Sequence, residues 1–223
     1  MDQNLGSFSE RWGGEEMKKS RGRPFRIAKK FSQILVLQND IDIALSTAMR
    51  HLNETMESER SSIFIFQPWN QTLTVYSSLD LKKSEISIPK DAGVAGWVFR
   101  KRKPAIVNDT NKDNRFYRGF DERTGFTTQK IICAPLILDK KQCIGTLQSM
   151  NKKKGGFKRI DLETIELAAH MLAIAISNWN HYIEIKNTNT AQRKIIEKFV
   201  DADIQLNKES SHLKIGKGPY PSI

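Results

Sequence analysis

Cysteine and long hydrophobic runs are scarce in this sequence. Only two cysteines occur in 223 residues, and Cys133 and Cys143 fall on the two arms of one predicted hairpin, out of register for a disulfide. The longest apolar run, residues 168–176, has about half of the length that spans a bilayer. The first residues lack the basic and then apolar regions of a secretion signal. We therefore expect a soluble cytoplasmic protein with reduced thiols and no membrane association.

Catalytic motifs are missing as well. No phosphate-binding loop of the form G-x-x-x-x-G-K-[ST] occurs, and no histidine belongs to an H-E-x-x-H pattern. The four histidines are scattered along the chain: His51, His170, His181 and His212. Asp121 and Glu122 are adjacent carboxylates, but carboxylates in loops are more often solvated than catalytic. We expect a binding protein that is not an enzyme and has no metal or cofactor, with any catalytic domain lying outside this chain.

The net charge of +11 is spread along the chain. Residues 1–30 carry eight basic and four acidic side chains, residues 31–183 carry 21 and 16, and residues 184–223 carry seven and five. Residues 21–24, Arg-Gly-Arg-Pro, resemble the core of an AT-hook, whose arginines enter the minor groove of DNA. Four residues carry little weight, because blocks of charge are usually solvated tails. We interpret residues 1–24 as a basic, disordered tail and do not expect DNA as a partner.

Helical periodicity dominates the first part of the chain. Residues 25–57 place apolar side chains three or four positions apart, and a break at residues 38–40 predicts two helices. Asn39 or Asp40 is the expected cap of the second helix, because both side chains accept hydrogen bonds from free backbone amides.

Strand patterns occupy the middle of the chain, interrupted by a short helix predicted over residues 93–99. The predicted strands are residues 61–67, 72–78, 85–89, 105–108, 130–138 and 143–151. A long helix is expected to begin at Phe157 or Lys158. These elements predict an α+β domain with an antiparallel sheet of about six strands and helices on one face.

The long helix carries more apolar residues than one sheet can cover. They recur at three- to four-residue spacing as far as Leu206, with an interruption predicted at residues 187–190. A helix with an uncovered apolar stripe needs a partner, although it could also fold back on its own sheet. We favour a homodimer formed by residues near 25–37 and 176–206. The expected parts are a tail (1–24), a domain with its flanking N-terminal helix (25–183), and a helical linker with a loose tail (184–223).

Three segments give the domain a specific resemblance. Residues 116–136, FYRGFDERTGFTTQKIICAPL, crowd charges, glycines and threonines together and then become an apolar strand. Together with GVAGWVF at 93–99 and IGTLQSMNKKKGGFKRID at 144–161, they resemble a GAF domain over roughly residues 40–180. The likeness is to the GAF domains that bind cyclic nucleotides in phosphodiesterases and bacterial adenylyl cyclases.

The resemblance implies a ligand site for cyclic AMP or cyclic GMP. Its implied contacts are Ser62, Tyr76 and Ser77 around the base, Val94 and Ala95 at the phosphate, and Tyr117, Asp121, Thr124, Thr128 and Gln148. Backbone N–H groups at the start of a helix suit a phosphate. Positions 117, 121, 124 and 128 are spaced by four, three and four, so a helical first half would turn them to one side.

A second family motif follows the last strand. The motif is N-K…F-x-x-x-D-E. This sequence matches it at Asn151, Lys152, Phe157 and Asp161, and Leu162 stands in place of its final glutamate. In the family the lysine and aspartate form a salt bridge that braces the pocket without touching ligand. The alternative is that Asp161 simply favours an early helical turn.

The implied function is a regulatory sensor that signals through a dimeric helical linker to an effector such as a cyclase or phosphodiesterase. Ser77 replaces an acid that helps to select guanine, and Gln148 replaces an acid near the ribose. We therefore favour cyclic AMP over cyclic GMP. Two alternatives are a ligand-free dimerisation or scaffold module and a redox or chromophore sensor, although Cys133 lacks the neighbouring histidine of bilin-binding GAF domains.

Overall fold

The computed structural model describes residues 22–38, 40–78, 86–139 and 142–213, except for the side chains of 77–78 and 200–213. Most of the tail predicted over residues 1–24 therefore lies outside the described residues. The chain divides into two compact units, residues 1–177 and residues 178–223. None of the helices in the described ranges is both long and apolar enough to cross a membrane.

The first unit is built on a six-stranded antiparallel sheet with strand order β3-β2-β1-β6-β5-β4, which confirms the predicted α+β class. The strands are β1 Ser58–Gln67, β2 Thr72–Ser78, β3 Ser87–Pro89, β4 Ala105–Val107, β5 Ile131–Ile137 and β6 Cys143–Lys152. The two longest strands, β1 and β6, lie at the centre and pair from Ser58 opposite Lys152 to Ile65 opposite Gly145. Gly145 is required there because the carbonyl of Phe64 leaves no space for a Cβ atom.

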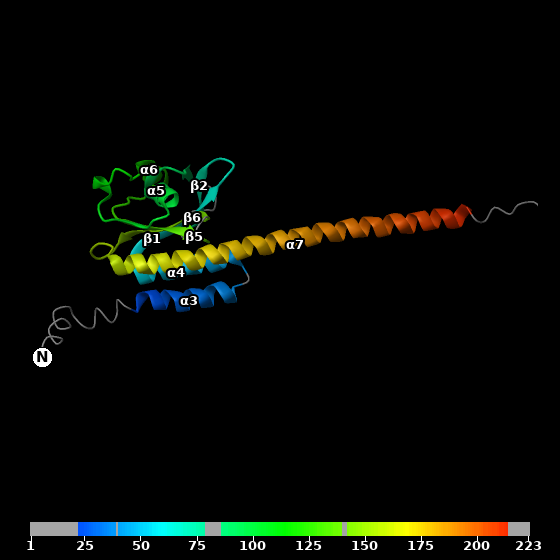
Figure 1. Ribbon diagram of the computed structural model, residues 1–223, viewed down its shortest axis with the longest axis horizontal. Coiled ribbons are helices and arrows are strands. Elements are labelled where there is room, and N and C mark those ends of the chain that lie inside the picture. The colour runs from blue at the N-terminus through cyan, green and yellow to red at the C-terminus, as the bar shows by residue number, and fades with distance from the viewer. Residues whose placement is uncertain (1–21, 39, 79–85, 140–141, 214–223) are drawn as a thin grey trace, which may run out of the picture. The chain divides into compact units, whose positions relative to one another are not determined.

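Long helices cover one face of this sheet (Figure 1). They are α3 Arg23–Leu37, α4 Ile41–Met56 and the first part of α7 Arg159–Leu213. The predicted break between α3 and α4 is present, and Asp40 is the cap of α4. Its Oδ1 accepts hydrogen bonds from the amides of Asp42 (2.8 Å) and Ile43 (3.3 Å).

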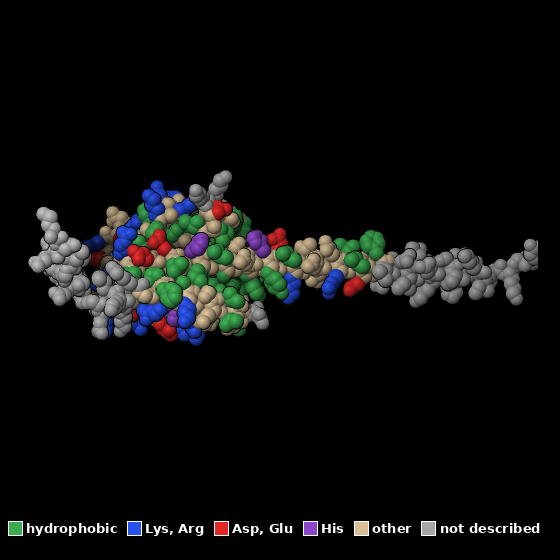
Figure 2. Space-filling view, turned by 60° about the horizontal axis from the view of Figure 1, so that its bottom comes forward, with side chains coloured by type: hydrophobic (Ala, Val, Ile, Leu, Met, Phe, Trp, Pro, Cys, Tyr) green, Lys and Arg blue, Asp and Glu red, His purple; other side chains and the backbone are tan. Residues whose placement is uncertain are grey.

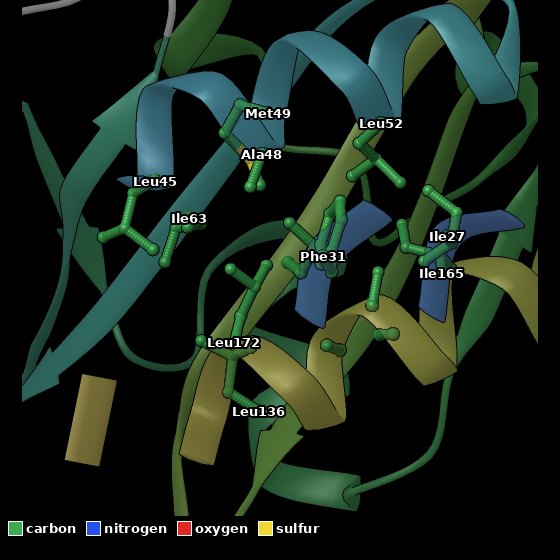
Figure 3. Close-up of a cluster of buried hydrophobic side chains, with 14 of the residues drawn as sticks. Ile27, Phe31, Leu45, Ala48, Met49, Leu52, Ile63, Leu136, Ile165 and Leu172 are labelled. Carbon is green, nitrogen blue, oxygen red and sulfur yellow. The ribbon is translucent and has the colours of Figure 1, made fainter. Parts of the chain in front are cut away.

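The main core lies between these helices and the sheet. Figure 3 shows Ile27 and Phe31 of α3 and Leu52 of α4 converging with Ile165 and Leu172 of α7. All five side chains are fully buried. Full burial of one such side chain contributes about 1.5–3 kcal/mol, so α3 is an integral part of the domain rather than an appendage.

Two short helices lie over the opposite face of the sheet, α5 Gly93–Lys101 and α6 Arg118–Thr124 (Figure 1). The short 3-10 helix η1 Thr110–Lys112 lies between them in the chain. A second apolar cluster forms under α5 and α6, with Phe64 and Val75 from the sheet and Val98 and Phe120 from the helices. The prediction of helices on one face thus holds for the long helices only. The strands end up covered on both sides, which makes a closed pocket possible.

In the second unit, helix α7 continues without the interruption predicted at residues 187–190. The hydroxyls of Thr188 and Thr190 donate to the carbonyls of Glu184 (3.0 Å) and Lys186 (2.9 Å), so these polar side chains are satisfied within the helix. Large apolar side chains are exposed along this unit: Tyr182, Ile185, Ile195, Ile196 and Phe199. Figure 2 shows hydrophobic side chains on this helix, with basic and acidic ones between them.

Candidate functional site

The start of α5 provides free backbone amides on the short-helix side of the sheet. Gly93 begins the helix with φ +71°, Val94 and Ala95 are buried, and Ala92 at the N-cap supplies no side-chain hydrogen bond. The amides of the first turn have no partner within the helix, and they point where the helix dipole favours an anion. A Cβ atom on Gly93 would lie 3.2 Å from the Cβ of Tyr117, so the chain at Tyr117 closes directly over this helix end.

Helix α6 forms a lid over the sheet. Phe120 packs edge-on against Phe64 of β1, with ring centroids 5.7 Å apart. Asp121 clasps the segment that follows the helix, because its Oδ2 accepts from the Thr128 amide (2.6 Å) and its Oδ1 from the Thr128 hydroxyl (2.7 Å). We call this double hydrogen bond the Asp121–Thr128 clasp, and it ties α6 to the residue that follows its loop.

Arginines anchor α6 and the residues on either side of it to three other elements, and we call residues 115–130 the lid segment. Arg60 of β1 lies over the Phe126 ring at 4.1 Å, and Arg123 donates to the carbonyl of Ser87 at 3.1 Å. Arg115 lies over Trp97 of α5 at 4.6 Å and binds both carboxylate oxygens of Asp113. That hydrogen-bonded guanidinium lowers the pKa of Asp113 below its ordinary value, and Asp113 raises the pKa of Arg115 in return.

A cavity of about 40 Å³ lies between the lid, the start of α5 and the sheet. It is lined by Phe64, Ile88, Gly93, Val94, Ala95, Phe116, Tyr117, Phe120, Asp121, Thr128, Ile131, Gln148 and Met150. A volume of this size holds roughly three water molecules. The lining is mostly apolar, with a few polar groups that converge from different elements, as is typical of a small-molecule site.

Six of the ten implied ligand contacts meet at this cavity: Val94, Ala95, Tyr117, Asp121, Thr128 and Gln148. Ser62 is fully buried on the same face of the sheet as Phe64 and pairs with Gln148 across the strands, but it does not line the cavity. The backbone of Ser77 pairs with Ile63, and its side chain lies outside the described residues.

Two implied contacts, Tyr76 and Thr124, lie away from the cavity. Tyr76 packs against the core on the long-helix side, because strand alternation sends Leu73 and Val75 to the cavity side and Tyr76 to the other. Thr124 is the last residue of α6, and its hydroxyl donates to the carbonyl of Phe120 at 3.0 Å instead of facing the cavity. The helical spacing of positions 117, 121, 124 and 128 does not bring all four side chains to the cavity, because the helix ends at Thr124.

The apolar lining was not foreseen from the sequence. Phe64, Ile131 and Met150 form the floor, and Phe116 and Phe120 form part of the cover. The sequence signal for these residues was the alternation in β1, β5 and β6. Alternation predicts on which face of the sheet each side chain lies, but it does not reveal that one of the two faces borders a cavity.

The second motif forms the predicted brace. Lys152 Nζ donates to Asp161 Oδ1 at 2.8 Å and to the carbonyl of Met56 at 2.9 Å, and both charged side chains are buried. Asp161 Oδ2 also accepts from the amide of Lys158 at 2.8 Å, at the start of α7, so the early-turn interpretation holds as well. Phe157 is buried beside them. The carbonyl and amide of Phe157 bond to the side chain of Asn108, which sequence reasoning did not single out.

Arg23 is a further member of the brace that sequence reasoning placed in the tail. It opens α3 together with Pro24, and its Nη1 donates to Asp161 Oδ1 at 2.9 Å. Pro24 suits the first turn of a helix, where no N–H partner is needed. Residues 23 and 24 therefore belong to the domain, and Arg21 of the AT-hook-like segment lies outside the described residues.

Asn151 connects the brace to the lid. Its side-chain oxygen accepts from the amides of Gln129 (2.8 Å) and Lys130 (3.2 Å). Its side-chain nitrogen donates to the carbonyl of Thr127 and to Glu59, both at 2.8 Å. The end of the lid segment is thereby fixed to the end of strand β6, next to Lys152.

A wider groove of about 780 Å³ opens beside the brace. It is lined mainly by charged side chains, several of which pair with one another, such as Arg23 with Glu57 and Lys152 with Asp161. It offers no aromatic ring for a base to stack on. The 40 Å³ cavity is therefore the better candidate for a nucleotide site.

The cysteines do not form a redox pair. Cys133 lies opposite Gln148, whereas Cys143 lies opposite Ile137, so the two are not cross-strand neighbours. Burial raises the pKa of both thiols, which keeps them protonated and unreactive near neutral pH.

The fold, with a small cavity between α6 and the sheet, defines a small α+β domain. A family model described as the GAF domain matches residues 40–176, and the chain belongs to this family, whose members are regulatory or sensory modules. The resemblance in the sequence is thus confirmed.

The curated relatives include cyclic-nucleotide phosphodiesterases. The chain is 23% identical over 189 residues to the bovine cone cGMP-specific 3',5'-cyclic phosphodiesterase subunit alpha'. The matched region covers 75% of this chain and 22% of that protein. It is 23% identical over 155 residues to the dual 3',5'-cyclic-AMP and -GMP phosphodiesterase 11A of Takifugu rubripes, covering 64% and 17%. The chain therefore spans about a fifth of the length of these relatives.

Solved GAF domains share the fold. That of a phosphoenolpyruvate-protein phosphotransferase from Coxiella burnetii has a TM-score of 0.65 at 15% identity, covering 72% of this chain and 96% of that one. The corresponding Acinetobacter domain has a TM-score of 0.61 at 16% identity, covering 74% and 97%.

Proposed function

We propose that this chain is a cytoplasmic sensor domain that binds a cyclic purine nucleotide, cyclic AMP in preference to cyclic GMP, in the cavity under α6. The single observation that carries the proposal is the convergence of the free α5 amides with Tyr117, Asp121, Thr128 and Gln148 on one cavity. The relatives named for cyclic-nucleotide hydrolysis support this choice of ligand class.

The phosphate belongs at the start of α5. Among the described residues, no lysine or arginine lines the cavity, so the helix amides must carry the negative charge. Tyr117 covers this helix end, and its ring suits stacking on a purine. The apolar floor of Phe64, Ile131 and Met150 suits the face of a base.

The cavity has to expand for such a ligand. Sites that enclose ligands of this size are about 300–1,000 Å³, whereas this cavity is about 40 Å³. The lid α6 must move outward, which breaks the Asp121–Thr128 clasp and frees both side chains to bond ligand atoms. Binding and lid movement are therefore one event in this proposal.

Calorimetric titration of the purified chain with cyclic AMP and cyclic GMP tests the function. We expect saturable binding, with a rise in melting temperature at millimolar nucleotide. Thr128→Val should weaken binding by about 5- to 100-fold, because it removes one hydroxyl from a buried site. Thr127→Val is the matched control, since Thr127 is exposed and uses only its carbonyl, and it should bind as the parent does. The absence of any binding by nucleotide-free protein would refute the function.

A dimer is the proposed output. Val36 and Leu37 of α3 are 78% and 74% exposed, and Ile196 and Phe199 of the second unit are 60% and 72% exposed. A second copy of the chain offers the same stripes, so a homodimer would bury them. Ligand-dependent movement could then pass to an effector such as a cyclase, phosphodiesterase or other signalling enzyme.

The second candidate function is a ligand-free dimerisation or scaffold module. The small, mostly apolar cavity favours it, because a cavity that holds roughly three waters is nearly filled by its own side chains. In that case the titrations above show no binding while the exposed stripes still pair.

A further inference from the structure

The wide groove beside the brace has the size of a ligand site. Its volume is about 780 Å³, and sites for small molecules are about 300–1,000 Å³. Three parts of the first unit line it: the start of α3, the end of α4 and the loop between β6 and α7. We call this space between Arg26, Glu54 and Lys158 the brace groove.

The brace groove carries positive charge that the protein does not neutralise. Its lining has five basic and three acidic side chains. Two of the basic ones, Lys152 and Arg23, both donate to the carboxylate of Asp161. Within the described residues, the side chains of the other three have no hydrogen bond or salt bridge: Arg26, Lys154 and Lys158.

These three cations come from two segments of the chain that are far apart in the sequence. Arg26 lies on α3, whereas Lys154 and Lys158 lie in the loop before α7. Like charges repel one another, so folding places them on one groove at an energetic cost that a bound anion would offset. A single exposed cation would simply be solvated, but three around one groove form a site for an anion.

His51 adds no charge to the brace groove at neutral pH. Burial lowers the pKa of its imidazole below the ordinary value, the nearby Glu54 raises it, and the charges of Lys30 and Arg26 lower it further. The positive charge of the groove therefore resides in its arginine and lysine side chains.

We propose that the brace groove binds a small molecule that carries two or more phosphate groups. A phosphate oxygen pair fits the planar guanidinium of Arg26, and the ammonium groups of Lys154 and Lys158 suit further oxygens. One phosphate group carries a charge of about −1.5 to −2 at pH 7, which leaves at least one of the three cations unmatched. The inference concerns a different site from the proposed nucleotide cavity and does not depend on it.

The acidic side chains of the brace groove favour a compact ligand over a nucleic acid. Glu54 and Glu57 line the groove at the end of α4, and their side chains are 68% and 52% exposed. A continuous strand would bring its next phosphates against these carboxylates, whereas a short ligand can remain beside the cations. A ligand held by Arg26 and Lys158 would join α3 to the start of α7, as the brace itself does.

The test is calorimetric titration of the full chain with inorganic tripolyphosphate and with fructose bisphosphate, which carries its phosphates on a carbon frame. The salt concentration should be 0.15 M, at which charges more than about 8 Å apart are largely screened. We expect saturable binding of one molecule per chain for at least one probe, with a rise in melting temperature. Orthophosphate should bind much more weakly, and the tighter of the two probes identifies the kind of ligand.

Variants locate the site. Arg26→Gln, Lys154→Gln and Lys158→Gln should each weaken binding by about 3- to 30-fold. Lys153→Gln is the matched control, because Lys153 is exposed beside Lys154 but does not line the groove, and it should bind as the parent does. Glu54→Gln should strengthen binding, because it removes a negative charge from the groove.

Four results would overturn the inference. They are the absence of saturable binding of either probe, equal losses for Lys153→Gln and Lys154→Gln, orthophosphate binding as tight as that of the better probe, and tighter binding of a single-stranded oligonucleotide. Complete displacement of the probe by cyclic AMP would place it in the cavity and would also overturn the inference. A chain that binds a probe and no cyclic nucleotide supports the inference although the proposed function fails. Thermal melts without ligand show which variants are folded, and variants on two separate segments give independent readings.

Discussion

Asp161 is the residue whose removal should destabilise the domain most. Its carboxylate is 1% exposed and accepts from Lys152 Nζ (2.8 Å), Arg23 Nη1 (2.9 Å) and the Lys158 amide (2.8 Å). Asp161→Ala leaves the buried Lys152 ammonium with the carbonyl of Met56 as its remaining acceptor. Removing one partner of a buried ion pair typically costs about 3–5 kcal/mol. For a domain of this size, that corresponds to a drop in melting temperature of roughly 6–20 °C.

The partners of Asp161 should matter less. Lys152→Met keeps the packed stem, and Asp161 retains Arg23 and the Lys158 amide, so we expect a loss of about 1–3 kcal/mol. Arg23 is 20% exposed in its side chain, and Arg23→Ala should cost about 1 kcal/mol once solvent screening is considered. The double variant of Asp161 and Lys152 should be little worse than Asp161→Ala, because the two residues act on each other.

Urea unfolding followed by tryptophan fluorescence measures these losses. Glu163→Ala is the control, because its pairing with Arg159 at 3.3 Å is exposed and four positions apart on α7. Such pairs contribute about 0.3–0.5 kcal/mol. Fully additive losses at Asp161 and Lys152, or an Asp161→Ala loss no larger than that of Glu163→Ala, would refute the brace.

Two further predictions concern association and pH. The intact chain should be a dimer by light scattering, and Leu37→Glu combined with Phe199→Glu should make it monomeric; a dimer unchanged by both substitutions would contradict the helical interface. Substitution is preferable to deletion of α3, because Ile27 and Phe31 are part of the core. The lowered pKa of Asp113 means that its pairing with Arg115 contributes stability above the ordinary value of 3.8, and this contribution is lost as pH falls through the lowered pKa. Melting temperatures between pH 5 and 2.5 should therefore fall less steeply for Asp113→Asn than for the parent, and equal slopes would contradict the pairing.

The strands and the helix boundaries were predictable because each depends on local pattern. Alternation marked β1 and β2, and the pattern at the start of α4 limited the cap to Asn39 or Asp40, of which the structure has Asp40. The same alternation also predicts the face of Tyr76. Leu73 and Val75 lie on one face of β2, so Tyr76, which follows Val75 in the alternation, lies on the other face. The family resemblance implied a ligand contact at Tyr76, whereas the periodicity of the strand predicts the face on which the side chain lies.

The other differences from the predictions concern contacts between residues far apart in the sequence, or polar side chains that find hydrogen-bond partners within their own helix. Arg23 and Asp161 are 138 positions apart, and no pattern near Arg23 indicates a buried carboxylate as its partner. The helix predicted to break at residues 187–190 continues, and the threonine hydroxyls in this stretch bond to carbonyls one turn earlier. The size of the cavity depends on how closely α6 approaches the sheet, which is a tertiary property.

The brace variants also test whether the cavity and the helices act together. Within five residues, β6 carries three side chains with different contacts. Gln148 lines the cavity, Asn151 binds the end of the lid segment, and Lys152 binds Asp161 at the start of α7. Contacts in series do not by themselves establish coupling, because coupling needs two arrangements with different affinities for ligand. Asp161 does not line the cavity. If Asp161→Ala weakens nucleotide binding under conditions in which the variant is fully folded, the brace is coupled to the cavity. If it lowers stability and leaves affinity unchanged, the brace holds the fold together without taking part in sensing.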